Sequence, residues 1–319
     1  MIGRDPRKGG VPLGTPAVAG AAVTVPAMRV GVVILPEHPW PRARELWERA
    51  EALGFDHAWT YDHLSWRMLR DDPWHAATPT LAAAAAVTER IRLGVLVASP
   101  NFRHPVPTAR ELITLDDLSE GRLTFGIGAG GVGWDATTLG NEPWSRKERT
   151  ERFEEFVELT DLLLRRPVTT WRGRYYAAHE ARNAPGCVQS PRIPFVVAGA
   201  GPRSLRLAVE HGQGWVTVGP YDREGGPAGI DESIAVVGDQ QAKVDEACVA
   251  AGRDPATLDR YALTGLNLTS GLGSPDEFDD LVGRYTEIGI TDLVVHWPRP
   301  TEPYQGDEAA FETLFASRC

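Results

Sequence analysis

Apolar stretches with strand-like and helix-like spacing alternate along the chain from Met28 onward. The run Val30–Leu35 is typical of a buried strand, and the next segment carries apolar residues at helical spacing. This alternation recurs and predicts eight strands, each followed by a helix. The predicted strands are Val30–Leu35, His57–Tyr61, Ile91–Ala98, Leu123–Ile127, Phe195–Val197, Val216–Val218, Tyr261–Asn267 and Thr291–His296. The predicted helices are Arg42–Leu53, Pro79–Thr88, Val106–Leu118, Ser145–Leu164, Arg203–His211, Ser233–Ala251, Pro275–Ile288 and Asp307–Ala316.

Short, largely apolar strands indicate a parallel sheet that is buried on both faces. Eight strand–helix units in 319 residues favour an α/β fold, a (β/α)8 TIM barrel with insertions at the C-terminal face of the strands. We assign residues 28–319 to this single domain. Residues 1–27 are rich in Gly, Pro, Ala and Val, and we expect a disordered N-terminal extension, with Met28 as the natural start of the protein as the alternative interpretation.

The composition of the chain limits the kinds of molecule that it is expected to bind. The chain is 42% hydrophobic and 24% charged with a net charge of −10, which argues against nucleic acid or an anionic membrane surface. No stretch reaches the roughly 18 apolar residues of a membrane span. Three cysteines without C-x-x-C spacing indicate a reducing cytoplasm. His38, His104 and His296 lack the spacing of metal ligands, so we predict no metal and a small-molecule substrate.

A candidate phosphate site lies within Ile193–Trp215. There the strand Phe195–Val197 runs into Gly199-Ala200-Gly201-Pro202 directly before a helical pattern. Glycines at this position let several backbone N–H groups and the positive end of a helix converge on one anion. A tight strand–helix turn without a ligand is the alternative.

A second glycine segment, Gly126–Gly131, formally matches the dinucleotide motif G-x-G-x-x-G. In a dinucleotide-binding fold a helix begins inside the motif, but here we expect no helix before Ser145, where Ser145 and Glu148 form a capping box. These glycines are better suited to let the backbone pass close to a flat ring system.

Functional side chains in such a barrel follow the carboxyl ends of the strands. Histidines and tryptophans occupy several of these positions. We therefore predict a substrate pocket lined by His38, Trp66, Trp134, His296 and Trp297. Core or lid packing is the alternative role for each tryptophan.

Seven short motifs together resemble the luciferase-like monooxygenase superfamily, whose members are flavin- and deazaflavin-dependent barrel enzymes. The motifs follow the family's order and spacing, and the likeness is weaker beyond Trp215. They are Thr60–Leu64 (TYDHL), Asp72–Trp74 (DPW), Thr88–Gly94 (TERIRLG), Thr114–Leu123 (TLDDLSEGRL), Gly126–Gly130 (GIGAG), Trp171–Tyr176 (WRGRYY) and Ala198–Arg203 (AGAGPR).

The resemblance implies that Asp62 and His63 lie beside the cofactor ring, where deazaflavin-dependent members carry an Asp-His pair. A histidine titrates near neutral pH and can transfer a proton while a hydride moves. A histidine that is merely hydrogen-bonded at a strand end is the alternative for His63, and a hydrogen bond to the ring is the alternative for Asp62.

The family pattern also implies two groups of cofactor-binding residues. The ring should be lined by Ala98, Ser99, Gly128, Ala129 and Gly130. Near Ala98-Ser99-Pro100 the family often has a bulge, in some members with a strained peptide bond, and an ordinary strand exit before Pro100 is the alternative. The phosphate should be surrounded by Gly199, Ala200, Gly201, Pro202 and Arg203, although Arg203 has a solvated position as its alternative. Parts of Trp171–Ser190 and Pro220–Ile230 should close over the substrate.

One position departs from the family. Sugar-phosphate dehydrogenases of the deazaflavin branch carry an acidic residue right after the fourth-strand glycines, where this chain has Gly131. Asp135 is then the nearest carboxylate. The departure disfavours a sugar phosphate and leaves room for a bulkier or more apolar substrate in contact with Trp134.

The resemblance thus implies an oxidoreductase that transfers a hydride between coenzyme F420, a deazaflavin, and a small organic substrate. Reduction of an activated C=C or C=N bond is the expected form. An FMN-dependent monooxygenase that uses oxygen is the alternative, and a barrel that binds a cofactor without catalysis is a third hypothesis. Because family members commonly dimerise through barrel helices, we expect a homodimer.

Overall fold

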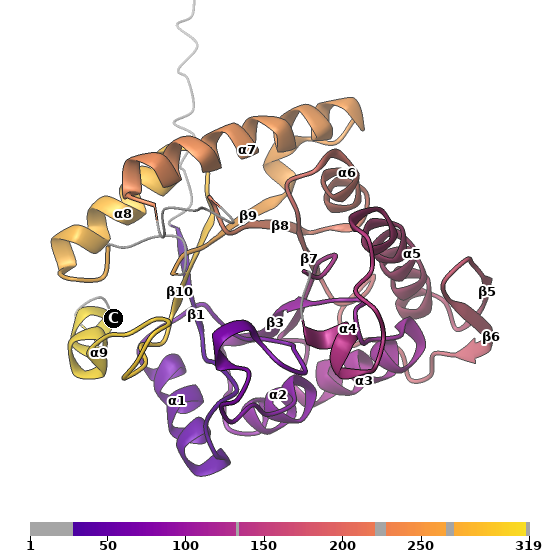
Figure 1. Ribbon diagram of the computed structural model, residues 1–319, viewed down its shortest axis with the longest axis horizontal. Helices are drawn as coiled ribbons and strands as arrows, with labels where there is room; N and C mark the ends of the chain where they lie inside the picture. Colours follow the sequence, from indigo (N-terminus) through magenta and orange to yellow (C-terminus); the bar gives the residue numbers. More distant parts are fainter. Residues whose placement is uncertain (1–27, 132–133, 221–227, 266–270, 317–319) are drawn as a thin grey trace, which may run out of the picture.

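In the computed structural model, parallel strands close into a barrel that is seen end-on in Figure 1. The structure describes residues 28–131, 134–220, 228–265 and 271–316, so the predicted extension 1–27 and the end of the predicted strand Tyr261–Asn267 lie outside it. Within these ranges the barrel has the predicted eight strands, and the fold prediction is confirmed. The strands are β1 (Arg29–Val33), β2 (His57–Thr60), β3 (Arg92–Ala98), β4 (Leu123–Ile127), β7 (Phe195–Ala198), β8 (Gly214–Thr217), β9 (Asp259–Leu263) and β10 (Asp292–His296).

Helices follow the strands and form a ring around the barrel (Figure 1). The longer ones are α1 (Trp40–Ala52), α2 (Ala77–Ala85), α3 (Pro105–Leu118), α5 (Arg146–Arg165), α6 (Pro202–His211), α7 (Ile230–Ala250), α8 (Pro275–Glu287) and α9 (Glu308–Ala316). Two 3-10 turns, η1 (Arg67–Leu69) and η2 (Pro255–Thr257), lie between them. In the described part of the chain, no helix combines the length and apolar character needed to cross a bilayer.

The segment after β4 corrects one prediction. We expected no helix before Ser145, but α4 (Trp134–Thr138) forms there. It begins after the glycine segment rather than inside it, so the dinucleotide motif still lacks its helix. The predicted cap at Ser145 is confirmed, because its Oγ accepts a hydrogen bond from the backbone N–H of Glu148 at 3.2 Å.

An insertion between α5 and β7 forms the antiparallel pair β5 (Val168–Arg172) and β6 (Ala177–Arg182). Glu155 of α5 anchors it by accepting hydrogen bonds from the N–H groups of Tyr175 and Tyr176, both at 3.0 Å. The pair lies on the outer side of α5 (Figure 1). The expectation that this insert closes over the substrate is therefore wrong, while most of the other predicted insert lies outside the described residues.

The strand pleat separates two apolar layers, because successive strand residues point to opposite faces. In β1 and just beyond it, Val32 and Ile34 pack with buried helix residues outside the barrel. Val33 and Leu35 belong to a second cluster, made of strand and strand-end residues inside it. The same alternation decides which side chains reach the barrel mouth.

Candidate active site

His63 and Asp62 follow β2 and take opposite sides of the barrel wall. Ala58 packs in the outer layer, whereas Trp59 and Tyr61 belong to the inner one. Continued alternation turns Asp62 toward the helices and His63 toward the mouth. The rings of Tyr61 and His63 meet edge to face with their centroids 6.2 Å apart. Of this predicted pair, only His63 is placed where a cofactor ring could lie.

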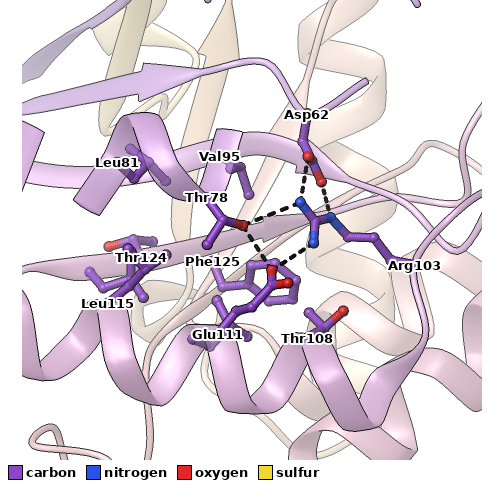
Figure 2. Close-up of a pocket in the computed structure, with 12 residues that line it drawn as sticks. Asp62, Thr78, Leu81, Val95, Arg103, Thr108, Glu111, Leu115, Thr124 and Phe125 are labelled. Atoms are coloured by element: carbon purple, nitrogen blue, oxygen red, sulfur yellow. Dashed lines mark hydrogen bonds and ion pairs between the residues drawn. The ribbon is translucent and has the colours of Figure 1, made fainter. Parts of the chain in front are cut away.

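Asp62 is bound on the outer side of the wall, as Figure 2 shows. Its carboxylate accepts hydrogen bonds from Nε and Nη2 of Arg103, the latter at 2.7 Å, and only 2% of the residue is exposed. Arg103 also donates to Glu111 of α3 at 2.9 Å. The cavity beside these residues measures about 20 Å³, which is enough for a water molecule and far too small for a cofactor. Asp62 therefore fastens the end of β2 to the β3–α3 segment.

His63 is held by a carboxylate from the segment after β4. Its Nδ1 lies 2.8 Å from Oδ2 of Asp135, and Oδ1 of Asp135 accepts a hydrogen bond from the backbone N–H of Leu64 at 2.7 Å. The indole of Trp74 donates to the His63 carbonyl at 2.9 Å. Asp135 is buried, while about a quarter of the His63 side chain is exposed. The ring is thus fixed at Nδ1, while part of the side chain stays accessible.

Aromatic side chains fill the mouth between β2 and β10. His296 stacks on Tyr304 with centroids 3.6 Å apart, and its Nε2 lies 2.8 Å from the hydroxyl of Tyr61. Burial lowers the pKa of His296 to about 3 and raises that of Tyr61 to about 12, so both are neutral at physiological pH. Trp66 stacks between Trp74 and Tyr304. This half of the mouth is a rigid neutral wall.

The opposite half carries small side chains. The β3–β4 register shifts between Val95 and Ala98, and the Leu96–Val97 peptide bond is cis. Leu96 and Val97 both join the inner layer as a result, while Ala98 returns to the outer layer. The predicted bulge exists, but it precedes its expected place. Val97, not Ala98 or the buried Ser99, faces the mouth there.

The absence of a side chain lets the backbone of Gly128 pack closely against Val97. A Cβ at Gly128 would lie 2.9 Å from Cγ2 of Val97 and 3.3 Å from Cβ of Ala198 on the neighbouring strand β7. Gly130 has φ +74°, which glycine adopts without cost, and its backbone lies against the side chain of Asn101. With Ala129, which is half-buried, and Ala198, we refer to Val97, Gly128 and Gly130 as the floor of the mouth.

The loop after β7 adjoins this floor. The indole of Trp215 donates to the Gly199 carbonyl at 2.7 Å and fixes the turn. Gly201 is the N-cap of α6, with no side-chain cap, and the space around it is open. Ala200 and Pro202 are exposed. Arg203 pairs with Glu154 of α5 instead of facing the turn, so any anion contact there falls to backbone N–H groups and to the hydroxyl of Ser204, whose side chain packs close to Gly199.

Comparison with known proteins decides the family. The family model for luciferase-like monooxygenases matches residues 28–287. The chain belongs to the luciferase-like monooxygenase family. It is 32% identical to the F420-dependent glucose-6-phosphate dehydrogenase of Beutenbergia cavernae, over 84% of this chain and 88% of that protein.

Two solved structures share the fold of this luciferase-like chain. One is an F420-dependent secondary alcohol dehydrogenase in complex with an F420-acetone adduct, with a TM-score of 0.75, 19% identity, and coverage of 91% of this chain and 98% of that one. The other is the monooxygenase RslO1 of Streptomyces bottropensis, with a TM-score of 0.72, 22% identity and the same coverages. Both likenesses support the barrel assignment.

Three further residues of the predicted pocket are Trp297, Trp134 and His38. Trp297 points outward, donates to Glu308 at 3.0 Å and packs on Phe311 of α9, so we withdraw it from the pocket. Trp134 is 40% exposed beneath the guanidinium of Arg70. His38 is half-buried, and burial lowers its pKa.

Three side chains at the site were not foreseen in their roles: Asp135, Arg103 and Tyr304. Asp135 stood out in the sequence only as the carboxylate nearest Gly131. Arg103 and Tyr304 lie on irregular segments, where no periodicity indicates the direction of a side chain. Tyr304 has φ +67°, a conformation that its own side chain disfavours, and its position depends on contacts with His296 and Tyr61.

Proposed function

We propose that this luciferase-like protein is an oxidoreductase that transfers a hydride between coenzyme F420 and a small organic substrate. The observation that carries the proposal is the position of His63. It lies at the barrel mouth, is hydrogen-bonded to a buried carboxylate, and has one edge accessible. The relative from Beutenbergia cavernae is named an F420-dependent dehydrogenase, which supports the same cofactor.

The residues present fit this cofactor. The floor of Val97, Gly128 and Ala198 would hold the deazaflavin ring, and the Gly199–Gly201 turn with the first turn of α6 would hold the tail phosphate. When bound, the deazaflavin supplies or accepts the hydride. His63 exchanges a proton with the substrate, and the aromatic wall excludes water.

The rim beside His63 indicates the substrate class. Leu64, Met68 and Trp134 are large apolar side chains that are 40%, 61% and 40% exposed. Position 131 is a glycine and carries no acid, and a Cβ placed there would have no neighbour within 4 Å, which leaves space for the substrate. We propose an uncharged, largely apolar substrate with an activated C=C or C=N bond.

Glucose 6-phosphate, the substrate in the name of the Beutenbergia relative, fits this rim less well. A phosphorylated sugar needs cations to bind its charge. Among the described residues near the mouth, Arg299 is already bound to Glu37 at 2.8 Å, while Arg70 keeps its charge above the ring of Trp134. The exposed apolar side chains of the rim, rather than a lack of cations, are therefore what favours a neutral substrate.

An FMN-dependent monooxygenase remains the second candidate, because a phosphate turn and a flat floor accept FMN as well, and RslO1 shares the fold. Titration of the protein with F420 and with FMN, each oxidised and reduced, separates the two. We expect micromolar binding of F420 and much weaker binding of FMN. Tight binding of FMN alone, with substrate turnover only under oxygen, would overturn the proposal.

We also propose that the protein works in the cytoplasm as a homodimer, in which the two subunits contact each other through α2. This helix carries alanines that are only partly buried, among them Ala82 and Ala83. Cys187 and Cys248 are free thiols, which suits a reducing compartment. Light scattering of wild type and Ala83→Arg tests the dimer: wild type should have twice the mass of the variant, and two equal masses would exclude this interface.

A further inference from the structure

The pairing of His63 with Asp135 has a consequence for the position of the histidine proton. Both oxygens of Asp135 are used on one side: Oδ1 accepts the N–H of Leu64 at 2.7 Å, and Oδ2 faces Nδ1 of His63 at 2.8 Å. An ionised carboxylate only accepts hydrogen bonds, so Nδ1 must be the donor in this contact. The neutral imidazole then carries its proton on Nδ1 and its lone pair on Nε2.

Nothing in the described part of the chain forms a hydrogen bond with Nε2 of His63. This nitrogen lies on the edge of the ring opposite Asp135, and the side chain retains 25% of its exposure. Nε2 is therefore the atom left to exchange a proton with a bound molecule. Nδ1 of His63 is thus bound to Asp135, and Nε2 is available for proton transfer.

Asp135 and His63 follow different strands of the barrel. Asp135 lies on α4, in the segment after β4, while His63 follows β2. A helix of five residues does not persist by its own backbone bonds. Its place is set by Asp135 together with the cation–π contact of Arg70 with Trp134 at 3.9 Å. The orientation of His63 thus depends on the same loop that forms the ring floor.

We propose that Asp135 is a positioning residue that holds the His63 proton on Nδ1 and directs Nε2 toward the reacting atoms. The role of Nε2 rests on the proposed function. When protonated His63 donates, the Nε2–H bond breaks, the proton goes to the substrate atom, and the Nδ1–H form is left bound to Asp135. In the reverse direction the Nε2 lone pair takes the proton back.

A purely structural carboxylate in the same chain provides the control. Asp116 is fully buried and accepts the N–H groups of Val188 at 2.7 Å and Gln189 at 3.1 Å, far along the chain from His63. Asp116→Asn should reduce stability without changing the state of His63. Asp135→Asn differs: its amide oxygen satisfies Leu64, its NH2 then faces Nδ1, and the Nε2–H form of His63 is favoured.

The test begins with the cofactor-free wild type. Nitrogen-15 NMR of the histidine side chains, assigned with His63→Gln, should show the neutral His63 protonated on Nδ1. The Asp135→Asn spectrum should shift toward the Nε2–H form, and that of Asp116→Asn should match wild type. A wild-type His63 protonated on Nε2, or an unchanged Asp135→Asn spectrum, would overturn the proposal whether or not F420 binds.

Kinetics adds a second readout. With reduced F420 and cyclohexenone, an uncharged probe with an activated C=C bond, we expect the kcat of Asp135→Asn to fall by about a hundredfold, with the KM of cyclohexenone and the Kd of F420 within about threefold of wild type. Asp135→Glu should recover part of the loss. An equal loss of kcat in Asp116→Asn would contradict a specific role. If F420 does not bind the wild type, the proposed function is wrong, but the NMR experiment still tests whether Asp135 positions the His63 proton.

Discussion

Asp62 and His63 are neighbours in sequence, yet the barrel wall separates their side chains, and this separation can be tested. We change Asp62 to Asn, which removes the negative charge and keeps the shape of the side chain. In the structure the carboxylate is bound to Arg103 on the outer side, away from the mouth. The variant should therefore lose stability and keep its affinity for the cofactor.

The size of the loss follows from burial. Removing one partner of a buried ion pair costs about 3–5 kcal/mol because the remaining charge is left uncompensated. Arg103 retains Glu111, whose side chain is 41% exposed, so we expect a value near the lower end. About 3 kcal/mol corresponds to a fall in the melting temperature of roughly 5 °C in a chain of this size. Glu111→Gln, which breaks the more exposed contact of Arg103, should cost at most about 1 kcal/mol.

Urea unfolding gives the free energies, and fluorescence titration gives the Kd of F420. We expect Asp62→Asn to bind F420 within about threefold of wild type while being clearly less stable than Glu111→Gln. A variant with wild-type stability and a Kd more than tenfold higher would refute the argument. The carboxylate would then face the ring, as the sequence suggested.

Three further expectations concern single positions. In Gly201→Ala the new Cβ meets no atom within 4 Å, so the melting temperature should stay unchanged. Because this Cβ would enter the proposed phosphate site, calorimetry should show the affinity for F420 reduced about tenfold. An unchanged affinity would mean that the phosphate binds elsewhere. In Gly199→Ala the new Cβ would lie 2.2 Å from Cβ of Ser204, and urea unfolding should show a loss of about 1–3 kcal/mol, which a neutral result would contradict. The pKa of His296, about 3 in the folded protein, is below its ordinary 6.5. The unfolded chain therefore binds the proton first, and stability falls as the pH drops from about 6.5 toward 3, by about 2 kcal/mol at pH 5. Between pH 7 and pH 5, the free energy of unfolding of His296→Gln should therefore fall by about 2 kcal/mol less than that of wild type. Parallel stability curves for the two proteins would refute the lowered pKa of His296.

The barrel could be predicted from sequence because its signal is local and repeated. Apolar strands, helical spacing and terminal glycines each specify an element, and eight consecutive units leave few other ways to bury both faces of the sheet. The predicted strand Leu123–Ile127 matches β4 to the residue. The Ser145 cap was equally readable, because a capping box depends on residues only three positions apart.

Side-chain direction at the strand ends was harder to predict. The pleat sends His296 inward and Trp297 outward, and it divides Asp62 from His63 in the same way. This rule is available in the sequence once the inner face of each strand is known, which requires the closed barrel. Arg203 shows the limit, since its partner Glu154 lies 49 positions away in sequence and no local pattern indicates their contact.

A crystal structure of the F420 complex tests the central claim most directly. The account predicts the deazaflavin ring on the floor of Val97 and Gly128, with Nε2 of His63 at its edge. The tail phosphate should accept hydrogen bonds from the backbone at Gly199–Gly201 and the start of α6. A ring bound outside the barrel mouth, or a phosphate held away from that turn, would contradict it.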